Sequence, residues 1–253
     1  MSANDGSVTV TTQGSIARIE FSHPKGNSLP GALLRQLADE ISAAGKRPDV
    51  NVVVLRSARE GPFCAGASFD ELVAIADERT GKEFFLGFAR VTLALIRCPK
   101  PVVTRVQGKV VGGGVGFVAA SDYVIAHRGA ALRLSELAVG IGPFVVGPAI
   151  ERKIGPGAFG AMALDADWRS AEWALAAGLY AQVHDSTADL DEACDTFVAK
   201  LAASNPDATT RIKQAMWAGT EGWDALLDER AAMSGRLVLS EHTRRAIASF
   251  KAK

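Results

Sequence analysis

The pattern of apolar and polar positions predicts two strands near the N-terminus, followed by a helix. Apolar and polar residues alternate over Val8–Thr12 and Ile16–Phe21, as on strands that bury one face, and Gly14 lies in the turn between them. A loop rich in Pro, Gly and Asn follows at His23–Ser28. Apolar residues then recur at helical spacing over Leu29–Ala44. The first segment is therefore predicted to be a β-β-α unit.

The same order of strand, loop and helix recurs further along the chain, without any repeat of the sequence itself. The segments predicted in this region are a strand at Asn51–Arg56, a loop at Glu60–Ser68, an amphipathic stretch at Phe69–Ile96, a strand at Val102–Val106, a helix at Val115–Ser121 and strands at Val124–Ala126 and Ala131–Leu134. The fold class predicted from this rhythm is α/β.

The second half of the chain is predicted to be mainly helical. Glycines interrupt it as far as Gly160, and Gly140–Phe144 is predicted to be a rigid loop. An alanine-rich helix at Ser170–Gly178 and a short strand at Leu179–Val183 follow, and the pattern is helical from Leu190 onward.

Composition narrows the classes of function. The chain has 253 residues, and 28 basic residues balance 28 acidic ones, so no strong field of one sign recruits nucleic acid or an anionic membrane. Its three cysteines are widely spaced without a CxxC pair, and its four histidines show no ligand spacing, so we expect neither disulfides nor a metal site. Met1–Gly6 lacks the basic and apolar pattern of a leader, and the cytoplasm is the expected compartment.

A glycine cluster at Gln107–Phe117 is the first candidate for chemistry, since glycine at this density indicates unusual backbone dihedrals or close approach to a ligand. A second glycine-bearing loop contains Ala65-Gly66-Ala67. The amides of Ala67 and Gly113 are candidates for an oxyanion hole, because preorganised N–H donors stabilise charge that develops during a reaction. The alternative is that both loops are only tight turns.

Glu136 is the candidate acid or base. It lies among Leu134, Leu137 and Val139, and burial among apolar side chains raises the pKa of a carboxyl group toward the range useful for proton transfer. The alternative is a glutamate in the first turn of a helix that Ser135 caps.

A nicotinamide site is a further alternative. Gly114–Ala119 matches G-x-G-x-x-A, and Glu136 follows about twenty residues later. The segment between them, Asp122–Gly129, breaks the crossover helix that such a site needs and resembles another strand. The match to the dinucleotide motif is therefore weak.

The motifs taken together resemble the crotonase superfamily, the enoyl-CoA hydratase/isomerase family. The matching stretches span nearly the whole chain in the expected order, and they are His23–Leu29, Phe63–Ala67, Val106–Gly114, Ser121–Ala126, Leu134–Gly140, Ala171–Leu179 and Ser240–Phe250. The resemblance implies a spiral of β-β-α units over residues 1–195 and a helical C-terminal trimerisation region over residues 196–253. It implies homotrimers, or dimers of trimers, with no metal or redox cofactor.

The resemblance also implies a substrate and its site. The substrate is an acyl-CoA thioester whose carbonyl lies between the amides of Ala67 and Gly113, with Glu136 as acid or base. Lys25 lies near the CoA nucleotide in this arrangement. The other residues implied to contact the substrate are Ala65, Gly66, Gly112, Gly116 and Phe144.

The chain departs from the family pattern at one catalytic position. Hydratases of the family carry two glutamates, and Gly116 occupies the position of the first. The resemblance therefore favours isomerisation of 3-enoyl-CoA to 2-enoyl-CoA by one base, Glu136. The alternatives are a 2-enoyl-CoA hydratase that uses Glu136 with a water, Asp70 or Glu71 in place of the missing carboxylate, and a catalytically silent acyl-CoA-binding homologue. The position of a further aspartate in dienoyl-CoA isomerases is Phe144, which sets that subclass aside.

Overall fold

A six-stranded sheet forms the centre of the protein in a computed structural model that describes residues 6–58 and 60–251. Residues 1–5, which carry most of the expectation about a leader, and residues 59 and 252–253 lie outside the described part. The strands of the sheet, in spatial order, are β1 (Ser7–Gln13), β2 (Ile16–Ser22), β4 (Val52–Ser57), β6 (Val102–Val106), β8 (Tyr123–His127) and β10 (Gln182–His184). β1 and β2 are antiparallel and all later neighbours are parallel.

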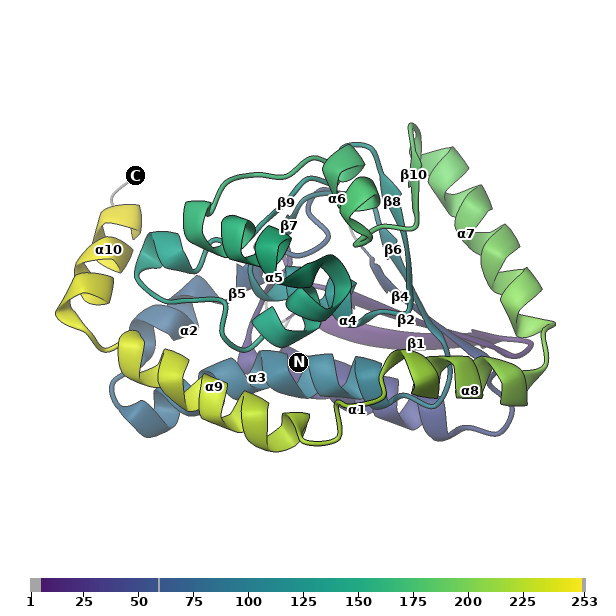
Figure 1. The fold of residues 1–253 in the computed structure, drawn as a ribbon, viewed down its shortest axis with the longest axis horizontal. Coiled ribbons are helices and arrows are strands. Elements are labelled where there is room, and N and C mark those ends of the chain that lie inside the picture. Colours follow the sequence, from purple (N-terminus) through teal and green to yellow (C-terminus); the bar gives the residue numbers. More distant parts are fainter. Residues whose placement is uncertain (1–5, 59, 252–253) are drawn as a thin grey trace.

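Each turn of the chain adds one strand beside the previous one, which gives the predicted spiral. After β2, β4, β6 and β8, the chain forms a second, short strand before it enters a helix (Figure 1). The short strands pair in parallel as β3 with β5 and β7 with β9, and they are β3 (Ser28–Leu29), β5 (Gly66–Ala67), β7 (Val110–Val111) and β9 (Leu132–Arg133). The predicted β-β-α repeat is confirmed.

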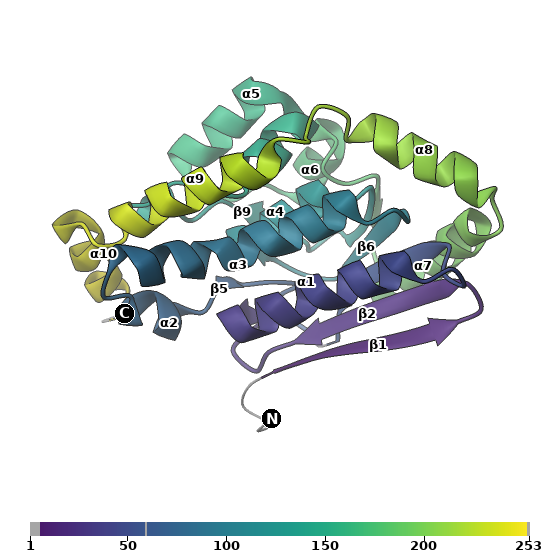
Figure 2. The same ribbon diagram turned by 90° about the horizontal axis from the view of Figure 1, so that it is seen from below.

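Helices cover both faces of the sheet. α1 (Gly31–Lys46) and α3 (Glu78–Arg97) lie on one face, while α7 (Thr187–Ala202) covers the other (Figures 1 and 2). β4 shows the consequence, because Val53 and Leu55 enter the large core while Val52 and Val54 pack in the cluster that contains α7 residues. A strand covered on both faces has no polar side, which explains the uninterrupted apolar run in the sequence.

The remaining helices follow the sheet or connect its repeats. They are α2 (Phe69–Ala74), α4 (Gly113–Ala120), the 3-10 turn η1 (Leu137–Val139), α5 (Gly147–Asp165), α6 (Ala171–Ala177), α8 (Pro206–Met216), α9 (Trp223–Leu237) and α10 (Glu241–Lys251). α9 runs alongside α3 in Figure 2. The two helices approach so closely that a Cβ atom on Gly81 would lie 2.9 Å from the Cα of Gly235.

Two predicted elements differ from the structure. The stretch Phe69–Ile96 is two helices, α2 and α3, because Asp77 caps α3 by accepting the Thr80 N–H at 2.7 Å. The short strands β3, β5 and β7 are not among the predicted elements, since a two-residue strand has no periodicity to detect. β3 spans the end of a predicted loop and the start of a predicted helix, β5 lies in the predicted loop Glu60–Ser68, and β7 lies in the glycine cluster.

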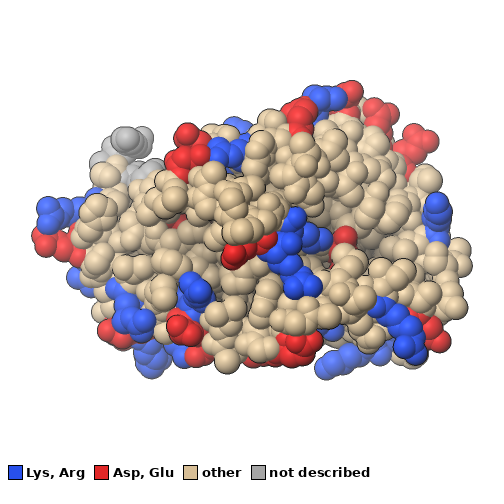
Figure 3. Space-filling view, in the orientation of Figure 1, with Lys and Arg blue, Asp and Glu red and all other residues tan. Residues whose placement is uncertain are grey.

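Charge is distributed evenly over the visible surface. Blue and red side chains are interspersed around the rim and near the centre of the face in Figure 3, and neither colour covers a large continuous area. Among the described residues, no helix combines the length and apolar composition required to span a bilayer.

The contact between α3 and α9 provides a test of the packing. We expect Gly81→Ala to destabilise the protein by about 1–3 kcal/mol, because the added methyl group meets the Gly235 backbone and neither helix can move away without opening the core. Urea unfolding measures this loss. The matched control is Gly157→Ala, whose methyl group meets nothing within 4 Å and should change stability by less than about 1 kcal/mol. Equal effects of the two substitutions would contradict the packing account.

Candidate functional site

A cavity of about 160 Å³ brings most of the predicted site residues together. It is bounded by β5, α3, the start of α4 and the segment from Ser135 to Val146. The residues predicted from sequence that line it are Ala65, Gly66, Ala67, Gly112, Gly113, Glu136 and Phe144. Lys25 and Gly116 are not among the residues that line it.

The first glycine loop directs one backbone amide away from its partner strand. Gly66 has φ 91°, and a Cβ atom there would lie 3.3 Å from the carbonyl oxygen of Val111, so only glycine fits without strain. The Ser68 N–H donates to the Leu29 carbonyl at 3.0 Å. Since successive N–H groups of a strand point to opposite sides, the Ala67 N–H faces away from β3.

The glycine cluster forms the turn from β7 into α4. Gly112 has φ 54° and ψ −123°, and Gly113 is the first helical residue. The first N–H groups of a helix have no acceptor within the helix, and the helix dipole makes them a favourable site for negative charge. The absent side chain of Gly113 is needed for packing as well, because its Cβ atom would lie 2.1 Å from the Phe88 ring.

The carboxyl group of Glu136 lies against this turn. A Cβ atom on Gly112 would be 3.2 Å from Glu136 Oε1, which places the carboxyl group beside the start of α4. Oε2 is buried and has no hydrogen-bond partner, although the residue as a whole is half-buried because other atoms of it reach the surface. Burial raises the pKa of Glu136 to about 7, against a smaller lowering by the Ser135 and Glu136 backbone N–H groups.

The alternative interpretation of Glu136 as a capped helix-start glutamate is not what the structure shows. Only the short η1 turn follows Glu136, and no side chain caps it. Ser135 contributes its side chain to the cavity wall instead. The predicted apolar surroundings are present in part, since Leu134 is fully buried and Val139 lines the cavity. Leu137, the third predicted neighbour, is exposed and does not line this cavity.

Gly116 lies inside the packed body of α4. Its added Cβ atom would be 2.4 Å from Cγ1 of Val146, so a valine occupies the space that a side chain at this position would need. The hydroxyl group of Thr92 lies nearby, 3.6 Å from the same point, and is buried without a hydrogen-bond partner. The placement of Gly116 does not support direct contact with a substrate.

The polar residues considered as replacements for a second carboxylate point elsewhere. The Lys25 ammonium group forms an ion pair with Asp70 at the surface. The Glu71 carboxylate accepts the Gly31 N–H at 2.8 Å. Neither carboxylate lines the cavity.

Aromatic residues that the sequence did not single out form the opposite wall. Phe84, Phe85 and Phe88 of α3 line the cavity, and Phe69 and Leu72 of α2 extend this wall. The sequence held one signal of this wall, because the three phenylalanines of α3 lie on one side of an amphipathic stretch. The cavity therefore combines an apolar wall with two backbone amides and one buried carboxyl group, as a site for a mainly apolar ligand with one reacting carbonyl requires.

The motif that suggested a nicotinamide site lies within a helix. Gly114 and Gly116 are buried in α4, where Cys64 and Val146 fill the space beside them. A dinucleotide site needs these glycines in an open turn before the helix, so this alternative fails. Within residues 6–58 and 60–251, no group of three or more His, Cys, Asp or Glu side chains is arranged to hold a metal.

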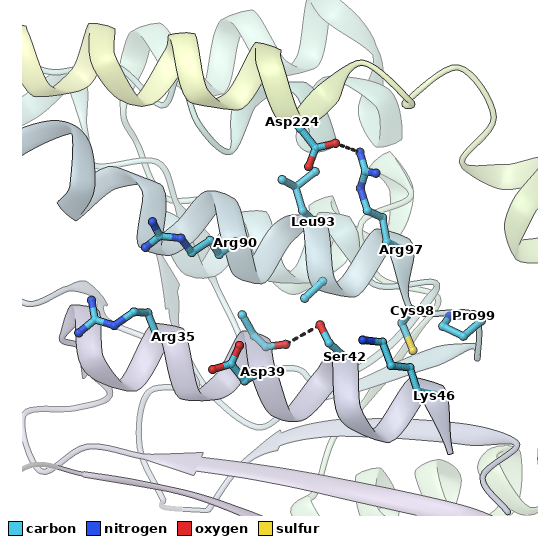
Figure 4. A pocket seen from close by; sticks show the side chains of 12 residues that line it. Arg35, Asp39, Ser42, Lys46, Arg90, Leu93, Arg97, Cys98, Pro99 and Asp224 are labelled. Atoms are coloured by element: carbon cyan, nitrogen blue, oxygen red, sulfur yellow. Dashed lines mark hydrogen bonds and ion pairs between the residues drawn. The ribbon is translucent and has the colours of Figure 1, made fainter. Parts of the chain in front are cut away.

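A larger hollow of about 550 Å³ lies between α1 and α3, and it contains none of the predicted site residues. Figure 4 shows the Arg97 guanidinium group directed at Asp224 of α9 across its upper edge. Arg90 forms a further ion pair with Glu83 at 2.6 Å. Because Arg90 and Arg97 are already paired and none of the predicted site residues lies here, we place the chemistry in the smaller cavity.

The similarity of this chain to known proteins covers nearly its whole length. A family model described as enoyl-CoA hydratase/isomerase matches residues 11–253. The chain is 34% identical over 131 residues to a (7aS)-7a-methyl-1,5-dioxo-2,3,5,6,7,7a-hexahydro-1H-indene-carboxyl-CoA hydrolase of Rhodococcus jostii (strain RHA1), a match that covers 51% of this chain and 50% of that protein. The match thus spans about half the length of that relative.

Two further similarities cover nearly full lengths. The chain is 27% identical over 247 residues to the 2,3-dehydroadipyl-CoA hydratase of Escherichia coli (strain K12), covering 96% of this chain and 95% of that protein. A crystal structure of an enoyl-CoA hydratase from Mycobacterium avium matches with a TM-score of 0.86 and 27% identity, covering 100% of this chain and 97% of the other.

The raised pKa of Glu136 predicts a pH-dependent effect of Glu136→Gln on stability. Between pH 4.5 and about 7 the unfolded chain ionises this group while the folded chain keeps its proton, so rising pH removes stability from the wild type only. Relative to wild type, the variant should therefore gain up to about 3 kcal/mol as pH rises through this window. Urea unfolding at pH 4.5 and pH 8 measures the difference. A difference that does not change with pH would rule out an elevated pKa.

Proposed function

Since the chain belongs to the enoyl-CoA hydratase/isomerase family, we propose that it acts on acyl-CoA thioesters and isomerises 3-enoyl-CoA to 2-enoyl-CoA with Glu136 as its only base. The observation that carries the proposal is one buried carboxyl group beside the start of α4, with Val146 in the space of a second. Isomerisation needs one group that first removes and then returns a proton. Hydration divides its proton transfers between two groups.

The proposed reaction begins when the ionised Glu136 carboxylate removes a proton from C2 of the acyl chain. The electron pair of the C2–H bond delocalises onto the thioester oxygen, which receives hydrogen bonds from the Ala67 and Gly113 N–H groups. The protonated Glu136 then delivers its proton to C4, and the double bond moves from C3–C4 to C2–C3. Atoms and charge balance, and the reaction consumes no water and no cofactor.

The pKa of Glu136 suits both halves of this cycle. At about 7 it lies close to neutral pH, so the carboxyl group is partly ionised before the reaction and becomes an effective acid once it is protonated. The apolar wall formed by Phe84, Phe85 and Phe88 keeps water from the enolate. A dry cavity also strengthens the hydrogen bonds from the two amides.

Hydration of 2-enoyl-CoA is the second candidate, and the name of the Escherichia coli relative that matches nearly the whole chain favours it. In this version Glu136 activates a water that attacks C3, and a water replaces the missing acid. A catalytically silent acyl-CoA-binding homologue is a further alternative. Turnover of a substrate panel separates the three.

The proposal extends to the rest of the substrate and to assembly. We infer that Lys25, which lies at the surface beside Asp70, contributes to binding the CoA nucleotide.

We also propose a homotrimer or a dimer of trimers, with the helices of residues 196–253 at the contacts. Exposed apolar side chains on α8, Ile212 and Met216, support a contact there.

The single-base mechanism predicts the loss of isomerisation in Glu136→Gln. We expect kcat to fall by about 10²–10⁴-fold, since an amide neither accepts nor returns the proton. In the wild type kcat/KM should rise as pH passes through about 7, because only the ionised carboxylate starts the reaction. The absorbance of the conjugated 2-enoyl thioester reports turnover. Glu192→Gln, on α7 across the sheet, is the matched control, and equal activity of the two variants would exclude Glu136 as the base.

The packing at Gly116 predicts that Val146 keeps a second carboxylate out of this site. Gly116→Glu alone should destabilise the protein, because its Cβ atom clashes with Val146. Combined with Val146→Gly, the new carboxylate has room, and Thr92 can donate to it. We expect the double variant to hydrate 2-enoyl-CoA at least about ten-fold faster than wild type. Val146→Gly alone is the control, and a folded double variant without this gain would contradict the account.

A further inference from the structure

A second cavity of about 360 Å³ adjoins the candidate site. The two cavities share the wall formed by Ile141, Gly142, Pro143 and Phe144. Phe144 divides them, because its ring lies over Gly142, where a Cβ atom would be 2.5 Å from the ring. An acyl chain long enough to cross this shared wall would meet the second cavity beside Phe144.

The second cavity is mainly apolar and has two charged residues in its lining. Phe159, Ala163 and Leu164 of α5 form much of its wall, while Arg230 of α9 and Glu151 of α5 carry its charges. Leu164 is 74% exposed and Leu137, also in the lining, is 43% exposed. Exposed apolar side chains that gather around one cavity are typical of a ligand-binding surface.

The guanidinium group of Arg230 has no partner among the described residues. Its Nε is buried and makes no hydrogen bond, and Glu151 does not lie within ion-pair distance of it. Lys82 of α3, by contrast, is paired with Asp228 of α9 at 2.8 Å. Since a buried N–H without an acceptor is unfavourable, a ligand in this cavity that supplied an acceptor would be stabilised by Arg230.

We propose that the acyl group of the substrate ends in a carboxylate, which Arg230 binds in the second cavity while the thioester lies at Glu136. The guanidinium group suits this role, because its planar set of N–H donors matches the two oxygens of a carboxylate. Glu151 lies in the same wall and weakens the binding of an anion. The inference rests on the proposed function for the thioester end of the substrate.

Calorimetry with saturated thioesters tests the inference without turnover, since these compounds lack the double bond that reacts. The probes are CoA monothioesters of dicarboxylic acids of about six to ten carbons, each paired with the unsubstituted acyl-CoA of equal length. For at least one length we expect the carboxylate probe to bind wild type about ten-fold more tightly than its neutral partner. Arg230→Met should abolish this preference and leave binding of the neutral probe unchanged.

Three further variants test whether the preference depends on the guanidinium group of Arg230 and on the charge of Glu151. Arg236→Met removes an exposed arginine from the same helix and should keep the preference. Glu151→Gln should strengthen binding of the carboxylate probe alone. Arg230→Lys should retain part of the preference, because it keeps the charge without the planar donors.

The possible failures can be told apart. A wild type without a preference at any length, or an Arg230→Met variant that weakens both probes equally, would overturn the role of Arg230. Such a protein could still isomerise 3-enoyl-CoA. Conversely, a wild type that shows the preference but converts no enoyl-CoA would support the role of Arg230 and refute the proposed reaction.

Discussion

The close packing around three glycines in the first turns of α4 is the constraint on which the rest of the site depends. The spaces beside Gly113, Gly114 and Gly116 are filled by Phe88, Cys64 and Val146, and an added Cβ atom would lie 2.1–2.7 Å from each neighbour. α4 is therefore held on three sides by α3, by the first glycine loop and by the start of α5. This packing fixes the N-terminus of α4 relative to Ala67 and Glu136, as the proposed binding of a ligand carbonyl by preorganised donors requires.

The same packing determines how many carboxyl groups the site can hold. A glutamate at position 116 would need the space of Val146, and that valine is itself buried where α5 begins. The one remaining carboxyl group, on Glu136, lies in surroundings that raise its pKa to about 7. A group that is easily ionised and easily protonated can serve as base and acid in turn, which is why one carboxylate is sufficient for a proton shift.

α3 and α9 connect the spiral to the helical C-terminal part. Their close crossing at Gly81 and Gly235 places Ser234 in the lining of the first cavity and Arg230 in that of the second. The aromatic wall of α3 faces the same space. α9 thus contributes Ser234 to the candidate site within one chain, and it carries Arg230 to the wall of the adjoining cavity.

The sequence by itself determined the repeating strand-and-helix order, the two glycine loops and the buried setting of Glu136. These depend on local periodicity, on the backbone freedom of glycine at Gly66 and Gly112, and on the apolar neighbours of Glu136. Together they brought seven predicted residues to one cavity.

Only the tertiary structure decided which distant residues meet. It paired the two-residue strands β3 with β5 and β7 with β9, placed Val146 in the space beside Gly116, and left Arg230 without a partner at a cavity wall. None of these follows from a periodic pattern. They arise when the spiral closes and side chains far apart in the chain compete for the same volume.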